Sequence, residues 1–193
     1  MTLSERLRRA LERRPAEPLL EGDLVEERAK ATIPAAVLMA VTDRPQPGLL
    51  LTVRHADLRT HAGQIAFPGG RVDAGEDAVA AALREAQEEI GLDPAAVEVV
   101  GAIEPYRTVT GYIVTPVLGA VPADISLQPH EPEVSDWFEA PLDFLLEPAN
   151  QKRRSALFEG RTRHYYEIVW QDRRIWGATA AMIINLARRL QWR

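Results

Sequence analysis

A chain of 193 residues, 46% hydrophobic and 26% charged, is long enough to bury a core unaided, and we predict a single domain over residues 1–193. The chain has no cysteine, which excludes disulfides, thiolate metal sites and cysteine nucleophiles and is consistent with a cytoplasmic location. The formal net charge of -5 weighs against a general nucleic-acid binder, although a local basic groove is compatible with that total.

The N-terminal segment predicts a docked helix rather than a targeting signal. Residues 1–15 lack the apolar core of a secretory signal, and no apolar run of the chain reaches the length of a membrane span. Leu3, Leu7 and Leu11 lie on one stripe, which predicts an amphipathic helix over residues 3–14 that packs on the domain. We therefore expect neither a membrane nor a nucleic acid as partner.

The later elements alternate irregularly between strands and helices. A buried strand is predicted at 33–41, followed by a turn at 43–48 and a second hairpin strand at 49–54. We predict the remaining elements in this order: a helix at 77–90, strands at 97–103, 112–118 and 134–138, a short helix at 141–146, a hairpin from 165–170 and 174–176, and a closing helix at 179–190. This mixture favours an α/β fold with helices flanking a mixed sheet.

The helix at 77–90 carries the most informative pattern. One stripe of this helix is apolar and suited to packing on a sheet: Val79, Leu83, Ala86 and Ile90. Separations of three and four residues place Glu85, Glu88 and Glu89 together on another face. Three carboxylates so close repel one another, and a hard divalent cation such as Mg²⁺ would reverse that cost. The alternative is a solvated acidic face on a surface helix.

The residues around these glutamates resemble the Nudix box. The box reads Gly, five residues, Glu, seven residues, Arg-Glu, an aliphatic residue, any residue, Glu-Glu, any residue, Gly and an aliphatic residue; its positions are Gly70, Glu76, Arg84, Glu85, Glu88, Glu89, Gly91 and Leu92. Ala86 stands where a larger aliphatic residue is usual. The resemblance implies a Nudix-type α/β/α sandwich with a mixed sheet. It also implies attack by water on a phosphorus of a nucleoside diphosphate linked to another group.

By the same resemblance, Glu85, Glu88 and Glu89 are the expected metal ligands, with Mg²⁺ as the ion and Mn²⁺ as an alternative. We add Gly70 to the ligand set, because Pro68-Gly69-Gly70 is expected to turn tightly and bring backbone carbonyls near the ion.

The catalytic residues predicted are Glu85, Arg84 and Glu88, with Glu85 as first candidate for the general base. Glu104 and Glu133 are alternatives outside the box, although each is also read as an ordinary surface residue. Arg84 is expected to pair with neighbouring carboxylates and hold the box loop, and Glu76 to cap or brace the helix.

The segment from Leu50 to Gly70 resembles the signature of the coenzyme A pyrophosphatase branch: Leu-Leu-Thr, any residue, Arg, a small residue, three residues, Arg, three residues, Gly, three residues, Phe-Pro-Gly-Gly. Its predicted substrate-binding residues are Arg54, Arg59, Gly63 and Phe67, and His55 departs from the pattern by standing where Ser or Ala is expected. The stretch 174–180 also resembles this branch. The two arginines would hold the 3′-phosphate or the diphosphate, with local ion pairing as the alternative, and Phe67 has core packing as its alternative.

The resemblance implies cleavage of coenzyme A, or of an acylated or oxidised derivative, to 3′,5′-ADP and 4′-phosphopantetheine or its acyl form. Two alternatives stay open. One is a Nudix hydrolase for another nucleoside diphosphate derivative, such as NADH or ADP-ribose, and the other is a non-catalytic module that binds a nucleotide. The expected partner is a small nucleotide substrate, and the chain is expected to be a monomer or a homodimer.

Overall fold

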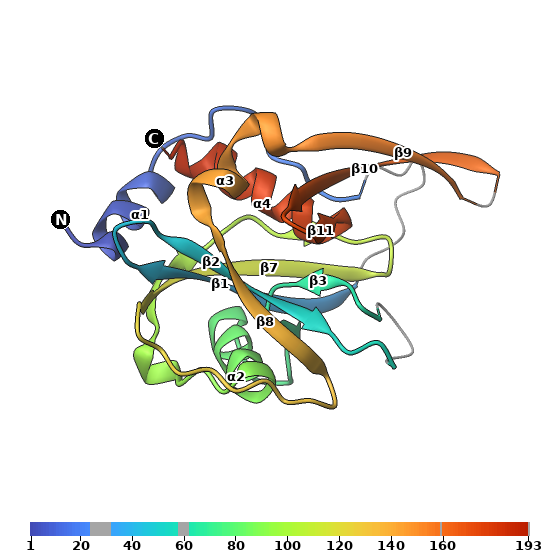
Figure 1. Ribbon diagram of the computed structural model, residues 1–193. Coiled ribbons are helices and arrows are strands. Elements are labelled where there is room, and N and C mark those ends of the chain that lie inside the picture. Colours follow the sequence, from blue (N-terminus) through green and yellow to red (C-terminus); the bar gives the residue numbers. More distant parts are fainter. Residues whose placement is uncertain (24–31, 58–61, 159, 193) are drawn as a thin grey trace.

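The computed structural model describes residues 1–23, 32–57, 62–158 and 160–192 and arranges them in layers around a mixed β-sheet (Figure 1). In this part of the chain the larger sheet has eight strands: β1 (Ile33–Asp43), β2 (Gly48–Arg54), β3 (Ile65–Ala66), β4 (Gly69–Arg71), β5 (Glu98–Ala102), β6 (Tyr106–Arg107), β7 (Tyr112–Pro122) and β8 (Val134–Pro141). The order is β3-β2-β1-β7-β5, with β4 paired to β1, β6 to β7 and β8 to β2. Only the β1–β7 pair is parallel among the pairs described, which confirms the predicted mixed sheet and the α/β class.

Helices cover both faces of this sheet, as a sandwich requires. Figure 1 shows α2 (Ala78–Ile90) on one face, with α3 (Leu142–Leu146) and α4 (Gly177–Leu190) on the other. A second sheet, made of β9 (Lys152–Phe158), β10 (Arg161–Trp170) and β11 (Arg173–Trp176), lies on the same side as α4. The first helix, α1 (Leu3–Leu11), packs against α4 and β5, and short 3₁₀ turns occur at Pro94–Ala96 and Pro148–Asn150. None of the described helices has the length and apolar character needed to cross a membrane.

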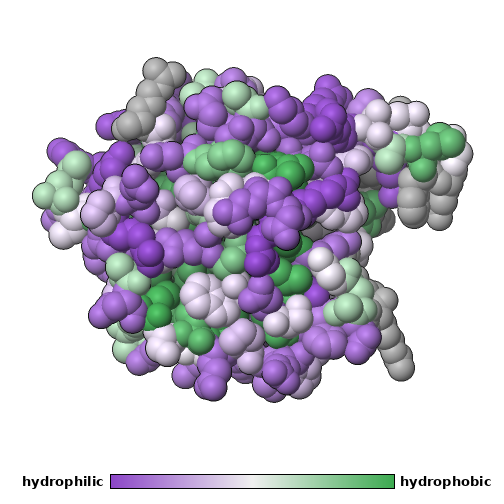
Figure 2. Space-filling view, viewed as in Figure 1, coloured by the Kyte–Doolittle hydropathy of each residue, from purple (hydrophilic) through white to green (hydrophobic). Residues whose placement is uncertain are grey.

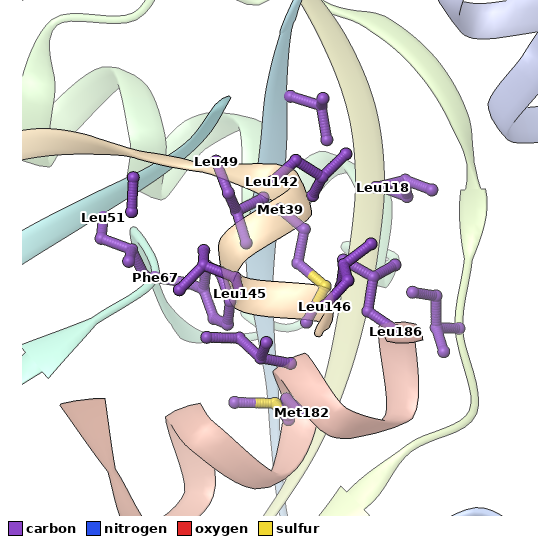
Figure 3. Packing of buried hydrophobic residues seen from close by; sticks show 14 of the residues in the cluster. Met39, Leu49, Leu51, Phe67, Leu118, Leu142, Leu145, Leu146, Met182 and Leu186 are labelled. Atoms are coloured by element: carbon purple, nitrogen blue, oxygen red, sulfur yellow. The ribbon is translucent and has the colours of Figure 1, made fainter. Parts of the chain in front are cut away.

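Two hydrophobic cores lie on opposite faces of the sheet. One joins the sheet to α3 and α4, and Figure 3 shows several of its members, including Met39, Leu49, Leu51, Leu118, Leu145 and Met182. The other joins the sheet to α2 and contains, among others, Leu38, Leu50, Ala82, Ala86 and Ile90. Because β1 is buried on both sides, its sequence is a continuous apolar run rather than an alternating one. Hydrophilic residues, in turn, cover most of the molecular face seen in Figure 2.

Local signals fix both ends of α2. The side chain of Asp77 accepts a hydrogen bond from the backbone N–H of Ala80 at 2.8 Å and caps the first turn. Gly91 ends the helix with φ at 66°, a left-handed conformation that favours glycine. The helix observed therefore matches the predicted range of 77–90 to within one residue.

Other boundaries differ from those predicted. Helix α1 ends at Leu11 rather than at residue 14, β7 and β8 extend beyond their predicted ends, and α4 begins at Gly177. Strand β9 was not predicted, because the basic segment 152–158 lacks an apolar alternation and is ordered through pairing with β10.

The apolar stripe of α2 also lies differently from the prediction. Ala81 and Ala82 are fully buried together with Ala86, whereas Val79 and Leu83 are only partly buried at its margin. Small side chains let the helix approach β1 closely, so these alanines, together with Ile90 of the predicted stripe, pack in the core against the sheet.

Candidate active site

Strand β4, helix α2 and the end of β2 meet at one place, and their polar side chains form the candidate site. Strand β4 pairs with β1 through Gly69 and Gly70, and α2 packs on both strands. A β-bulge between Val53 and Arg54 ends the regular pairing of β2 with β8. Val53 pairs with Asp136 and Arg54 with Val134, so the extra residue of the bulge is Ser135 in β8, and Arg54 is the last residue of β2 in this pairing.

Glu89 is the buried member of the carboxylate group. Its residue exposure is 3%, its Oε2 accepts the backbone N–H of Gly69 at 3.1 Å, and its Oε1 lies 4.0 Å from Nη1 of Arg54. Burial raises the pKa of Glu89 to about 7, although the hydrogen bond from Gly69 and the charge of Arg54 both act to lower it. Glu89 therefore has a high proton affinity, and it lies where a metal cation would bind.

Glu85 lies half-buried beside Gly70. Burial raises its pKa above 4.5, partly opposed by the hydrogen bond that Arg84 donates from Nη1 at 2.9 Å. A Cβ atom placed on Gly70 would lie 2.3 Å from Oε1 of Glu85, so any larger side chain at this position would displace the carboxylate end of Glu85.

Gly69 and Gly70, which precede the helix, allow close packing and do not form a turn. The predicted tight turn at Pro68-Gly69-Gly70 is wrong, because residues 69–71 form β4 and neither glycine has a positive φ. A Cβ on Gly69 would lie 2.4 Å from the carbonyl oxygen of Ala36, so extended backbone packing explains the first glycine and the Glu85 carboxylate explains the second.

Glu88 occupies the outer side of the group. Its side chain is 59% exposed, and Arg84 Nη1 donates a hydrogen bond to its Oε2 at 3.2 Å. The three glutamates thus lie at three depths, and no group of three or more acidic or histidine side chains in the described residues is already gathered around one point. A cation bound here would draw Glu85 and Glu88 away from Arg84, which lies between them.

Arg84 acts as a brace for the box loop, as the sequence predicts. It donates two hydrogen bonds of 3.0 Å to the two oxygens of Glu76, and a third of 3.0 Å to the backbone carbonyl of Arg71. These bonds hold the pKa of Glu76 below its ordinary value. Because the guanidinium is directed at protein partners, we assign Arg84 a positioning role rather than the catalytic role predicted. Glu76 braces the loop, and the cap belongs to Asp77.

Glu133 joins the site from outside the box. Its charge raises the pKa of both Glu85 and Glu89, and its backbone carbonyl accepts the N–H of His55 at 2.9 Å, next to Arg54. The sequence offers Glu133 as an alternative base and also as an ordinary surface residue, and does not choose between the two. The signal that identifies it is its place directly before β8, which pairs with the end of β2.

Glu104, the other alternative, lies elsewhere. It forms an ion pair with Arg189 in the last turn of α4. The structure therefore does not bring Glu104 to the candidate site.

The predicted substrate-binding residues are only partly assembled. The buried Nε of Arg54 has no hydrogen-bond partner among the described residues. Gly63, with φ at 68°, donates its N–H to the carbonyl of Arg54 at 3.1 Å and so shapes the loop beside it. Phe67 is 3% exposed and packs in the core, as its alternative reading predicts. Arg59 lies outside the described residues.

The donor set fits a hard divalent cation. Glu85 and Glu89 both have raised pKa values, and the nearby charge of Glu133 raises them further. Mg²⁺ commonly takes one or two carboxylates together with water and substrate oxygens, and such an ion would offset the repulsion. The residues that would hold it are Glu85 and Glu89, with Glu88 reaching in from the outer side.

Comparison with known proteins is consistent with this geometry. A family model described as the NUDIX domain matches residues 32–159. The chain is 47% identical over 154 residues to the uncharacterized Nudix hydrolase NudL of Escherichia coli strain K12, covering 79% of this chain and 80% of the relative. The NudL of Shigella boydii serotype 4 has the same identity and coverage. Among solved structures, the Nudix hydrolase RenU of M. smegmatis matches with a TM-score of 0.51 and 24% identity, over 57% of this chain and 71% of that chain, a likeness of fold alone.

Proposed function

The chain belongs to the Nudix family and is a hydrolase of a nucleoside diphosphate derivative, and we propose that its substrate is coenzyme A or a close derivative. Hydrolysis of the pyrophosphate bond would release 3′,5′-ADP and 4′-phosphopantetheine, or the acyl form of the latter. Nudix hydrolases generally use divalent metal ions, and we propose Mg²⁺ here, with Mn²⁺ able to replace it.

One observation carries the proposal: a buried carboxylate of raised pKa stands 4.0 Å from an arginine whose buried Nε has no partner in the described residues. The carboxylate favours a cation and the arginine favours an anion, so the pair suits a phosphate ester that arrives with a metal ion. The segment from Leu50 to Gly70, which resembles the coenzyme A pyrophosphatase branch, supports the choice among pyrophosphate substrates.

Each residue of the candidate site would have a separate role in the hydrolysis. A divalent ion at such a site neutralises phosphate oxygens and lowers the pKa of a bound water. Glu85 and Glu89 would hold the ion from α2, and Arg54 would pair with the diphosphate beside them. Glu85 is our first candidate for the base that would accept the proton of the attacking water, and Glu133, whose charge raises the pKa of Glu85 and Glu89, is the second. Arg84 would hold the box loop through Glu76 and the backbone carbonyl of Arg71.

A substrate panel with product identification by mass tests this function. Coenzyme A, dephospho-coenzyme A, NADH, ADP-ribose and a nucleoside triphosphate are compared at equal concentration with Mg²⁺. We expect coenzyme A to give the highest kcat/KM and to yield 3′,5′-ADP. Slow cleavage of coenzyme A beside fast cleavage of ADP-ribose or NADH would overturn the substrate, and binding without turnover of any compound would favour a non-catalytic module.

Variants separate the roles of the side chains. Arg54→Gln removes the predicted diphosphate contact and should raise KM about tenfold or more, since a charged hydrogen bond contributes about 1.5–3 kcal/mol. Arg44→Gln is the matched control, because Arg44 pairs with Glu139 at the hairpin between β1 and β2. Whichever of Glu85→Gln and Glu133→Gln lowers kcat more, at saturating metal, identifies the base.

A further inference from the structure

The segment that forms the β9–β11 sheet is unusually basic for this chain. Residues 152–176 carry seven basic and three acidic side chains, a net charge of +4, whereas the remainder of the chain carries -9. The strand register divides this segment into two faces. Ile168 and Ile175 are fully buried on one face and pack into the core. The opposite face brings together Lys152, Arg154, Arg163, Tyr165, Glu167, Arg174 and Trp176.

Glu167 organises this outer face by holding two arginines. Its carboxylate accepts Nε of Arg154 at 3.0 Å through one oxygen and Nε of Arg174 at 2.5 Å through the other. The hydrogen bond from Arg174 is the main reason that the pKa of Glu167 lies below its ordinary value, so the carboxylate is ionised and the group of three keeps a net positive charge. The side chains of Arg154 and Arg174 are 54% and 49% exposed, respectively, and their Nε atoms point toward Glu167.

Two aromatic rings border one of these arginines. The guanidinium carbon of Arg174 lies 5.1 Å from the ring centre of Trp176 and 5.8 Å from that of Tyr165, and the two rings meet edge to face at 5.8 Å. Nη2 of Arg174 also donates to the hydroxyl of Tyr165 at 3.1 Å. These contacts fix the guanidinium in one orientation, and a fixed guanidinium beside an exposed indole suits a phosphate attached to a planar ring.

Two strand contacts connect this group to the candidate active site. Strand β11 lies against β3, which pairs with Val53 at the end of β2, one residue before Arg54. The first turn of α4 directly follows Trp176, and there the hydroxyl of Thr179 donates to the carbonyl of Ile65 in β3 at 3.0 Å. The arginine–aromatic group is thus connected to Arg54 through β11, β3 and the end of β2.

We propose that Arg174, Arg154 and Trp176 form a second subsite that binds the nucleoside end of the substrate, with the guanidinium groups on a phosphate distal to the bond that is cut and the indole on the base. The inference rests on the proposed function, because Arg54 lies beside Glu89 and is thereby assigned to the diphosphate, which leaves the 3′-phosphate of coenzyme A for another cation. The ligand class is a nucleotide that carries a phosphate on its ribose in addition to the 5′ position.

Binding of two product-like nucleotides tests the subsite without turnover. We compare 3′,5′-ADP with 5′-AMP by calorimetry in the presence of EDTA, since the two differ only in the 3′-phosphate. The unmodified protein should bind 3′,5′-ADP at least tenfold more tightly. Arg174→Gln should remove most of that preference, and Trp176→Leu should weaken both ligands whereas Trp176→Phe retains them. Arg44→Gln serves as the exposed-arginine control, and thermal unfolding checks that each variant is folded.

The outcomes separate this proposal from the function on which it rests. Preference for 3′,5′-ADP through Arg174 in a protein that cleaves no coenzyme A would sustain the subsite and remove the proposed substrate. Cleavage of coenzyme A with an unchanged preference in Arg174→Gln would sustain the function and overturn the subsite. The third outcome is that a single-stranded RNA of ten nucleotides binds through Arg174 while 3′,5′-ADP and 5′-AMP bind with equal affinity. This result would assign the face to nucleic acid and overturn the proposed subsite.

Discussion

Replacing Glu89 by glutamine should stabilise the metal-free protein at alkaline pH while abolishing its activity. The carboxylate is almost fully buried, and its pKa rises from an ordinary 4.5 to about 7 in the folded chain. A carboxyl group whose folded pKa is raised stabilises the fold below its unfolded pKa, and this contribution is lost as pH rises through the folded pKa. At pH 8 the ionised side chain therefore destabilises the fold, whereas at pH 5 it is largely protonated.

The shift sets the size of the effect. A difference of about 2.5 pKa units corresponds to about 3 kcal/mol at pH 8 and to less than about 1 kcal/mol at pH 5. Glutamine keeps an acceptor for the N–H of Gly69 but removes the charge near Arg54, which offsets part of the gain. We therefore expect Glu89→Gln to raise the free energy of unfolding at pH 8 by roughly 1–3 kcal/mol, or several degrees in melting temperature.

Urea unfolding in EDTA at pH 5 and pH 8 measures this difference, with Glu88→Gln as control because Glu88 is largely exposed. Addition of Mg²⁺ should then stabilise the unmodified protein, by about 2.7 kcal/mol at one hundred times the dissociation constant, and leave Glu89→Gln unchanged. A variant that is destabilised equally at both pH values would refute the reasoning, since Glu89 would then be a well-paired structural carboxylate. Retention of Mg²⁺-dependent turnover in Glu89→Gln would refute its role as a ligand.

Four further substitutions test the residues around the carboxylates. Gly70→Ala should displace the flexible end of Glu85 and lower kcat about tenfold or more with little change in melting temperature, whereas Gly69→Ala should lower the melting temperature because it meets backbone; both are read from kinetics and thermal unfolding side by side. Arg84→Lys should lower kcat by a similar factor of about ten, since an ammonium cannot replace a guanidinium that bonds four partners at once; full activity would contradict its role as a brace. Gly91→Ala, at φ 66°, should cost about 1 kcal/mol of stability and leave kcat unchanged, and an unaltered urea midpoint would contradict the left-handed cap.

Elements with local signals were predictable from sequence, and those that depend on distant pairing were not. The ends of α2 follow from Asp77 and Gly91, which cap the helix through hydrogen bonds to its own backbone. Strand β9 exists through its register with β10, and β4 through its register with β1, and neither partner is evident from the segment alone. The same reason explains the glycines before the helix, which sequence reasoning assigned to a turn although they fit against another strand.

The sequence predicted which residues form the candidate site but not how deeply each side chain is buried. Helical spacing correctly places Glu85, Glu88 and Glu89 near one another, yet it does not say which edge of that face lies under β4. The depth depends on Ala82 and Ala86, whose small side chains bring the helix close to β1 and carry Glu89 inside. The sequence named both Glu133 and Glu104 as alternatives and could not separate them, because the proximity of Glu133 is a consequence of the pairing between β8 and β2.

The site holds a buried carboxylate, Glu89, next to a partly buried guanidinium, Arg54. Their charges are opposite, which restricts the ligands that can satisfy both. A free metal ion would neutralise Glu85 and Glu89, but it would repel Arg54 and leave its buried Nε without an acceptor. A free phosphate would satisfy Arg54, but it would face three carboxylates, those of Glu85, Glu89 and Glu133. A magnesium–pyrophosphate pair presents both charges at once, so metal and substrate should each strengthen the binding of the other. That coupling, rather than tight binding of either component alone, is the property expected of a site whose carboxylates are not gathered in advance.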